Sequence, residues 1–205
     1  MKPTDALGSL LRVGRPIMET REVAVRLGIS VSRASHLLRS LEESGLVRRV
    51  RHGLWALDRD LDPFVVPPYL TAPLPAYVSF WSALARHGVI EQIPRKIFVA
   101  SLDRTKRVTT TLATYSIHHL APQLFGGYSG SEEKGYIATP EKAVFDTVYL
   151  RSSRGGRLLL PELELPEGFE RRSLQYWVSR ISRPRLRTLV SRGLAKALAG
   201  AVAGA

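Results

Sequence analysis

The feature that most constrains this chain is a change of hydrophobic period near residue 45. Between Thr20 and Gly45, apolar side chains recur at three- and four-residue spacing, in two runs separated by Gly28-Ile29-Ser30. Two short β-prone runs follow, LVRRVR and LWAL, and His52-Gly53 joins them. This order predicts two helices connected by a tight turn and then a β-hairpin.

Capping residues and glycines set the expected ends of the helices. Residues 3–11 carry a short helical pattern, and Thr20 is expected to cap the helix that follows it. A third helix is expected to begin between Ser30 and Ser32 and to end near Ser44. Two helices joined by a three-residue turn that contains glycine form a helix-turn-helix motif, and the hairpin after them predicts a winged version of it.

The third predicted helix has one face without carboxylates. Its leucines line one side, and the opposite side and its margin carry Ser32, Arg33, Ser35, His36 and Arg39. A recognition helix reads base edges with residues near its N-terminus, where it enters the major groove of duplex DNA. We therefore expect Ser32, Arg33 and His36 to contact bases. For any one of these residues alone, an ordinary solvated helix face is the better explanation, and the set of five shifts the balance.

The predicted hairpin is basic at and near its tip. Arg48, Arg49, Arg51 and His52 cluster there, where lysine and arginine usually meet phosphate or enter the minor groove. Trp55 has apolar neighbours and is expected to pack in the core. These residues complete a predicted interface for double-stranded operator DNA.

The stretch between residues 63 and 75 contains five prolines, which predicts a stiff linker without regular structure. We expect a DNA-binding domain at 1–62, this linker at 63–75, and a second domain at 76–205. The second domain mixes helical and strand patterns: a helix at 79–86, strands at 96–100 and 109–119, and a helix that Thr139-Pro140-Glu141 opens and that runs to about residue 150. The expected fold class is α+β, with a winged helix-turn-helix domain followed by a mixed α/β domain that ends in basic helices.

The C-terminal region from residue 171 contains no Asp or Glu. Apolar residues at helical spacing predict two packed helices there, and residues 197–205 are expected to be frayed. The absence of carboxylates favours binding to phosphate or to an acidic protein over a merely solvated face. The predicted basic surface comprises Arg171, Arg172, Arg180, Arg183, Arg185, Arg187 and Arg192, together with Lys196.

Three segments of the second domain resemble the AbiEi-type antitoxins, transcriptional regulators of phage-defence loci. They are YVSFWSALARHGVIEQIP at 77–94, KIFVA at 96–100 and GYIATPEKAVFDTVYL at 135–150. That family also carries a winged helix before this domain, and the similarity runs from about residue 5 to residue 193. The resemblance implies an antitoxin that represses its own operon, with a nucleotidyltransferase as the toxin.

The composition limits the alternatives. The formal charge of +12 favours polyanionic partners, and the lack of cysteine excludes disulfides, thiolate nucleophiles and cysteine-based zinc sites. No apolar run is long enough for a signal peptide or a membrane span, so the expected location is the cytoplasm, with no membrane partner.

Catalytic signatures are also missing from the sequence. There is no Walker loop, dinucleotide-binding fingerprint or His-Glu-x-x-His motif. Residues 127–131 approach a hydrolase elbow but lack its last glycine, and a flexible loop is expected there. His118 and His119 should point to opposite faces of a strand, and Glu141 and Asp146 are poorly spaced for a joint site. We expect no catalysis, no cofactor and no metal.

Three functions remain open at this stage. The first is a DNA-binding autorepressor and antitoxin whose basic C-terminal helices meet a toxin or the toxin's RNA substrate. The second is a solitary winged-helix regulator, or an RNA-binding or toxin-masking module, without a cognate toxin. The third, a nucleic-acid-processing enzyme, has the weakest support.

Overall fold

The N-terminal domain is a winged helix-turn-helix with a small three-stranded sheet. The computed structural model describes residues 3–155 and 161–203. The sheet has the strand order β1-β3-β2, because the segment before α2 pairs with the hairpin as a third strand. In chain order the elements are α1 (Pro3–Leu11), β1 (Ile17–Glu19), α2 (Thr20–Leu27), α3 (Val31–Glu43), β2 (Arg48–Arg51) and β3 (Leu54–Ala56).

The turn between α2 and α3 forms as the sequence predicts. Gly28 ends α2 with a φ of 63°, a left-handed conformation that favours glycine, and Ser30 accepts a hydrogen bond from the Arg33 amide at 3.2 Å. The expected cap of α2 is displaced by one residue. Glu19 is the N-cap, and its amide donates to the Glu22 carboxylate at 2.7 Å. The Thr20 hydroxyl instead accepts a hydrogen bond from the Trp55 indole at 2.9 Å.

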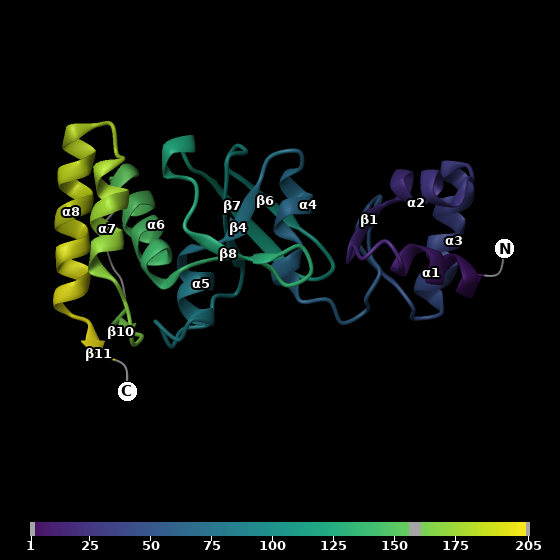
Figure 1. The fold of residues 1–205 in the computed structure, drawn as a ribbon, viewed down its shortest axis with the longest axis horizontal. Helices are drawn as coiled ribbons and strands as arrows, with labels where there is room; N and C mark the ends of the chain where they lie inside the picture. The colour runs from purple at the N-terminus through teal and green to yellow at the C-terminus, as the bar shows by residue number, and fades with distance from the viewer. Residues whose placement is uncertain (1–2, 156–160, 204–205) are drawn as a thin grey trace.

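The second domain is a six-stranded mixed sheet with helices packed against it (Figure 1). The sheet order is β6-β7-β5-β4-β9-β8, with parallel pairs at β5/β7 and β4/β9 and antiparallel pairs elsewhere. The elements of the second domain, in chain order, are η1 (Pro63–Val65), α4 (Pro67–Thr71), β4 (Ala76–Val78), α5 (Phe80–Arg86), β5 (Ile97–Ser101), β6 (Lys106–Thr109), β7 (Thr114–His119), η2 (Pro122–Leu124), β8 (Tyr128–Ser131), β9 (Gly135–Ala138), α6 (Pro140–Ser153), β10 (Glu164–Leu165), α7 (Arg171–Ser179), α8 (Pro184–Ala199) and β11 (Val202–Ala203). Strands β10 and β11 form a separate two-stranded sheet.

Both faces of this sheet are apolar and buried at its inner strands, such as β4 and β5. Successive residues of a strand point to opposite faces, so Tyr77 packs with α5, α6, α7 and α8, whereas Val78 packs on the other side. Ala100 and Val99 of β5 divide in the same way. Because no face of the sheet is left for solvent, each must be covered by other elements of the chain.

The prediction of a linker at 63–75 was wrong. These residues form η1 and α4, with Val65, Val66 and Leu70 buried. Proline is tolerated in the first turn of a helix, where its missing N–H has no partner to lose, and Pro67 lies at such a position. The proline density therefore indicates helix starts, and the apolar residues between the prolines supply core.

The winged helix contributes to the same core as the sheet. Val50 and Leu54 of the hairpin belong to a buried cluster with Val65, Tyr115 and Ile117 of the second domain. The two domains thus share one continuous apolar cluster, and the second face of the sheet is covered by α4 together with the winged helix.

Polar contacts reinforce this junction. The Thr111 amide and hydroxyl donate to the carbonyls of Val50 and Arg49, at 3.0 and 2.5 Å. Glu132 accepts hydrogen bonds from the Arg15 guanidinium at 3.0 Å and from the Tyr69 hydroxyl at 2.9 Å. The connection between α1 and β1 and the strand β2 are therefore both bonded to turns of the second domain.

Three further local expectations differ from the structure. The strand expected at 109–119 is a hairpin, because the Thr110 amide bonds to the Ala113 carbonyl and turns the chain between β6 and β7. The loop expected at 127–131 contains β8, which pairs with β9. The C-terminal region expected to fray continues α8 to Ala199, and 202–203 then pair with β10.

An ion pair lies inside the second domain. Lys142 and Asp146, one turn apart on α6, are fully buried and bonded to each other. Lys142 also donates to the Leu124 carbonyl at 2.8 Å, and Asp146 accepts from Ser79 at 2.7 Å and Tyr77 at 3.2 Å. A buried charge pair is tolerated only when its remaining donors and acceptors are satisfied, and these contacts meet that condition. We infer a structural role for the pair, which holds α6 to the sheet.

His118 is held as a neutral ring inside the second domain. Arg154 donates to its Nδ1 at 3.1 Å, so the ring proton lies on Nε2, which is 3.1 Å from the Ser116 hydroxyl. Burial, with Arg154 and Lys96 nearby, lowers the pKa of His118 from 6.5 to about 4. The neighbouring His119 is exposed, so the two histidines point to opposite sides as expected.

The buried His118 makes stability pH-dependent. The unfolded chain binds this proton below pH 6.5 and the folded chain only below about pH 4, so stability is lost as the pH falls through this window. His118→Gln should reduce the slope of unfolding free energy against pH there, by at most about 1.4 kcal/mol per pH unit. Urea unfolding of both proteins at several pH values measures this. An equal slope in the two proteins would show that His118 does not supply it.

Candidate nucleic-acid interface

A basic cleft lies between the recognition helix and the wing. Its volume is about 600 Å³, and side chains from α2, α3 and the hairpin line it. Of the residues predicted from sequence, the cleft brings together Ser35, Arg39, Arg49, Arg51 and His52. The arginines and His52 are exposed, so a phosphate backbone can approach them without displacing other side chains.

Three predicted residues lie outside the cleft, on the exposed surface of α3. Ser32, Arg33 and His36 are solvent-exposed. The Arg39 guanidinium donates to Nδ1 of His36 at 3.3 Å and to the Ser35 carbonyl at 3.4 Å, so it is oriented along the helix. The helix therefore presents Arg33 and His36 to bulk solvent and Arg39 toward the wing.

Arg48 does not belong to this interface. Its guanidinium donates to the Thr111 carbonyl at 2.9 Å, in the turn between β6 and β7. Strand alternation is the reason, because Arg49 and Arg51 share the cleft side of β2, whereas Arg48 and the buried Val50 face the second domain. Of the three arginines expected to act together, the structure places Arg49 and Arg51 in the cleft and Arg48 outside it, and contact of the first two with DNA stays a prediction.

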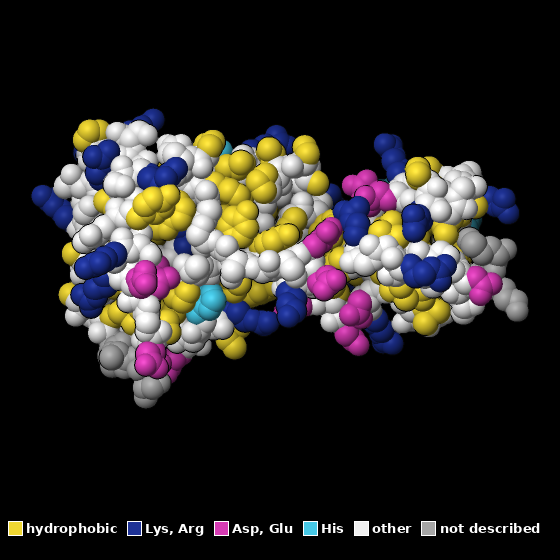
Figure 2. Space-filling model, in the orientation of Figure 1, with side chains coloured by type: hydrophobic (Ala, Val, Ile, Leu, Met, Phe, Trp, Pro, Cys, Tyr) yellow, Lys and Arg dark blue, Asp and Glu magenta, His cyan; other side chains and the backbone are white. Residues whose placement is uncertain are grey.

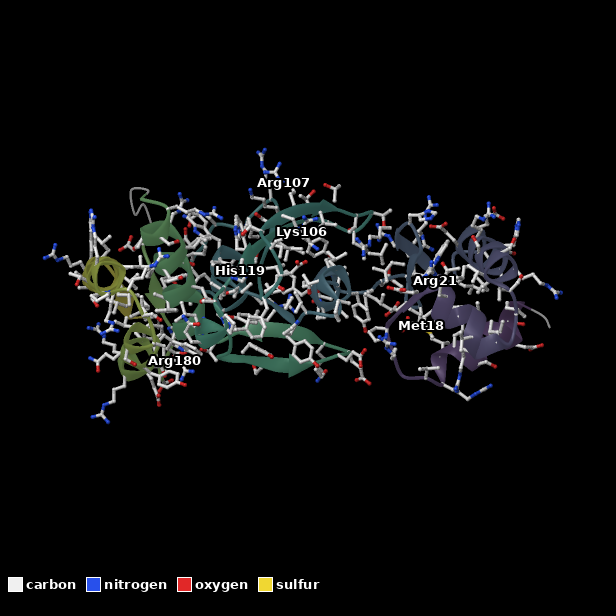
Figure 3. The ribbon with its side chains drawn as sticks, turned by 90° about the horizontal axis from the view of Figure 1, so that it is seen from above. Met18, Arg21, Lys106, Arg107, His119 and Arg180 are labelled. Atoms are coloured by element: carbon white, nitrogen blue, oxygen red, sulfur yellow. The ribbon has the colours of Figure 1, made fainter. Side chains whose placement is uncertain are left out.

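Two residues of the interface were missed by sequence reasoning. Arg21 and Val31, at the starts of α2 and α3, also line the cleft. Figure 3 labels Arg21 at the winged-helix end of the molecule. The signal that could have found them is position, since residues at the N-termini of both helices of this motif face the duplex.

Carboxylates lie beside the basic side chains at two places. Glu19 lines the cleft, and the Glu42 carboxylate accepts a hydrogen bond from the Arg49 amide at 3.1 Å. The second contact holds the hairpin against the end of α3, so it fixes the angle between wing and recognition helix. The side chains of Arg49 and Arg51 remain directed into the cleft.

A second basic surface lies on α7 and α8, at the other end of the molecule (Figure 2). All of the predicted arginines are exposed there, and Leu174, Trp177 and Val190 hold the two helices against the core. The arginines have different roles. Arg180 donates to the Gln123 carbonyl at 2.7 Å, and Arg187 donates twice to the Ile181 carbonyl, so these two fasten backbone segments.

Two other kinds of site, metal centres and membrane-spanning helices, are not found among the described residues. Among residues 3–155 and 161–203, no three His, Asp or Glu side chains gather as a group that could hold a metal ion. In the same part of the chain, no helix is both long enough and apolar enough to cross a membrane.

Comparison with known families agrees with this geometry. Residues 7–51 match the model of the IclR helix-turn-helix domain. No curated protein matches the chain. The N-terminal segment is therefore similar to an IclR-type helix-turn-helix domain, which supports DNA binding and a transcriptional regulator.

The division of the wing arginines can be tested by salt dependence. Replacing Arg49 and Arg51 with alanine should lower the slope of log affinity against log salt for duplex DNA by about 0.9 per lost phosphate contact. Arg48→Ala is the matched control, because it removes the same charge from the same strand but on the other face. Fluorescence anisotropy at several salt concentrations measures the slopes. A control that lowers the slope as much per arginine as the double variant would contradict the assignment.

Proposed function

We propose that this protein is a DNA-binding autorepressor and the antitoxin of a toxin–antitoxin operon. The observation that carries the first half is the cleft, where the recognition helix and wing direct Arg39, Arg49 and Arg51 to one side. This arrangement of helix and wing suits a helix in the major groove and a wing on the adjacent phosphate backbone. We expect no catalytic activity from this chain.

Base discrimination is assigned to the exposed N-terminal half of α3. Arg33 has the reach and the planar donors to bind the major-groove edge of guanine with two hydrogen bonds. His36 lies one turn further on the same helix, where Arg39 orients its ring. These two residues determine the operator sequence, whereas the cleft arginines supply affinity for any duplex.

Arg33→Ala should weaken binding to the operator by about 1–3 kcal/mol and binding to random duplex by much less. The operator is first found by footprinting the protein on the DNA upstream of its own gene. Arg26→Ala serves as the control, since Arg26 is an exposed arginine of α2 outside the cleft. Equal loss on both duplexes would reduce Arg33 to a phosphate contact.

The antitoxin half rests on the resemblance of the second domain to AbiEi-type antitoxins and on its charge. The family would pair this chain with a nucleotidyltransferase toxin. The exposed arginines of α7 and α8, with no Asp or Glu in that region, offer a surface for an acidic partner or for the toxin's RNA substrate.

The two activities should separate in the full-length chain. Because the domains share a buried cluster, point variants are preferable to fragments. An operator-blind variant, with Arg33, Arg49 and Arg51 replaced by alanine, should lose repression of a reporter and still rescue growth when expressed with the toxin encoded beside it.

The outcomes distinguish the alternatives. If the operator-blind variant fails to rescue although it is folded and abundant, antitoxicity works through repression alone. If even the parent protein does not rescue, the chain is a solitary regulator without a cognate toxin. Circular dichroism and immunoblotting provide the checks on fold and amount.

A further inference from the structure

A second cavity, of about 610 Å³, lies between the end of α6 and the connection from α7 to α8. Arg183 and Arg185 line it, together with the hydroxyl-bearing residues Ser152, Ser153 and Ser182. Both arginines are exposed, and neither guanidinium hydrogen-bonds to any other described residue. The cavity is large enough for one nucleotide and combines cations, hydroxyls and an apolar floor.

A hydrogen-bonded network extends from this cavity to an exposed aromatic ring. The side-chain amide of Gln123 donates to the Ser182 hydroxyl at 3.4 Å, and the backbone carbonyl of Gln123 accepts from the Arg180 guanidinium at 2.7 Å. Arg180 also donates to the Tyr176 hydroxyl at 2.7 Å, and its guanidinium lies 5.2 Å from the centre of that ring. Tyr176 is 53% exposed, although it is a large aromatic residue. The ring is therefore held in place at the surface and is linked through Arg180 to Gln123, which lines the cavity.

We propose that this cavity and Tyr176 bind single-stranded RNA. One nucleotide occupies the cavity, with its phosphate on Arg183 and Arg185 and its ribose near the serine hydroxyls. The neighbouring base stacks on Tyr176, beside the oriented guanidinium of Arg180. Unpaired bases stacked on aromatic rings, with arginines on the backbone, are the common means by which proteins hold single strands.

The shape of the site favours a single strand over duplex. The bases of a closed helix are stacked and paired and cannot turn into the cavity, whereas an unstacked nucleotide can, and the exposed ring has no use in binding a closed helix. The proposal rests on the proposed function and deepens it, because it names single-stranded RNA, of the two partners considered there, as the ligand of the surface on α7 and α8. Figure 3 shows Arg180 at the end of the molecule opposite to Arg21, so this site is separate from the DNA cleft.

The test uses the full-length chain with Arg39, Arg49 and Arg51 replaced by alanine, so that the cleft is silenced in every sample. The probe is a fluorescein-labelled RNA of about twelve uridines, matched to typical single-strand site sizes. We expect Tyr176→Ala to weaken binding at least about fivefold through lost stacking. Arg183→Ala with Arg185→Ala should lower the salt slope by about 0.7, the value for the one phosphate that the two arginines share.

Two further variants separate the cavity from its charge. Ser152→Trp fills the cavity and should weaken binding with an unchanged salt slope. Arg192→Ala with Lys196→Ala removes two charges from α8 outside the cavity lining and should change affinity less than twofold. This pair is the matched control for Arg183 and Arg185, since both pairs lie on or next to one helix.

Several results would overturn the proposal. If the control pair weakens RNA binding as much as the cavity pair does, RNA binding depends only on the overall positive charge of this surface and not on the cavity. Unchanged affinity in Ser152→Trp and Tyr176→Ala would lead to the same conclusion. Stronger competition by polyglutamate or by duplex RNA than by unlabelled oligouridine would assign the surface to an acidic protein or to a duplex instead.

Discussion

The whole molecule depends on a sheet that is apolar on both faces. Tyr77 and Val78, adjacent in β4, belong to two different buried clusters, so neither side of the sheet can face water. Helices α5, α6, α7 and α8 cover one side. The other is covered by α4 and by the wing through Val50 and Leu54. The winged helix and the second domain are therefore held together by the burial of shared apolar side chains, as well as by the chain that connects them.

Most local elements could be predicted from the sequence, because their signals are local. Gly28 and Ser30 fix the helix-turn-helix, and Thr139 with Pro140 opens α6 as expected. The packing of 63–75 could not be predicted, because proline marks both linkers and helix starts, and only tertiary burial decides between them. The pairing of β1 with the hairpin was missed for a similar reason, since three residues carry too little periodicity to identify a strand.

The sequence was sufficient to predict a basic interface on the wing, but it was less reliable in predicting which individual residues belong to it. The sequence indicates a basic wing, but strand alternation and the cluster around Val50 decide that Arg48 turns toward Thr111. Likewise, the count of arginines after residue 170 cannot tell Arg187, which bonds to the Ile181 carbonyl, from Arg183, which lines a cavity. Sorting arginines into those that fasten backbone and those that face solvent requires coordinates. This distinction also determines which variants test binding and which would disturb the fold.

The shared core at the junction makes the distance between the two ends of the molecule a fixed quantity. The winged helix and α8 lie at opposite ends of the long axis (Figure 1), and the Thr111 and Glu132 contacts resist bending between them. A molecule seated on duplex DNA through α3 therefore projects its other basic end away from that duplex. If the proposed RNA site is correct, two polyanions would be held at once without competing for the same charges. The protein would act as a rigid spacer, and occupancy at one end would leave the other end accessible.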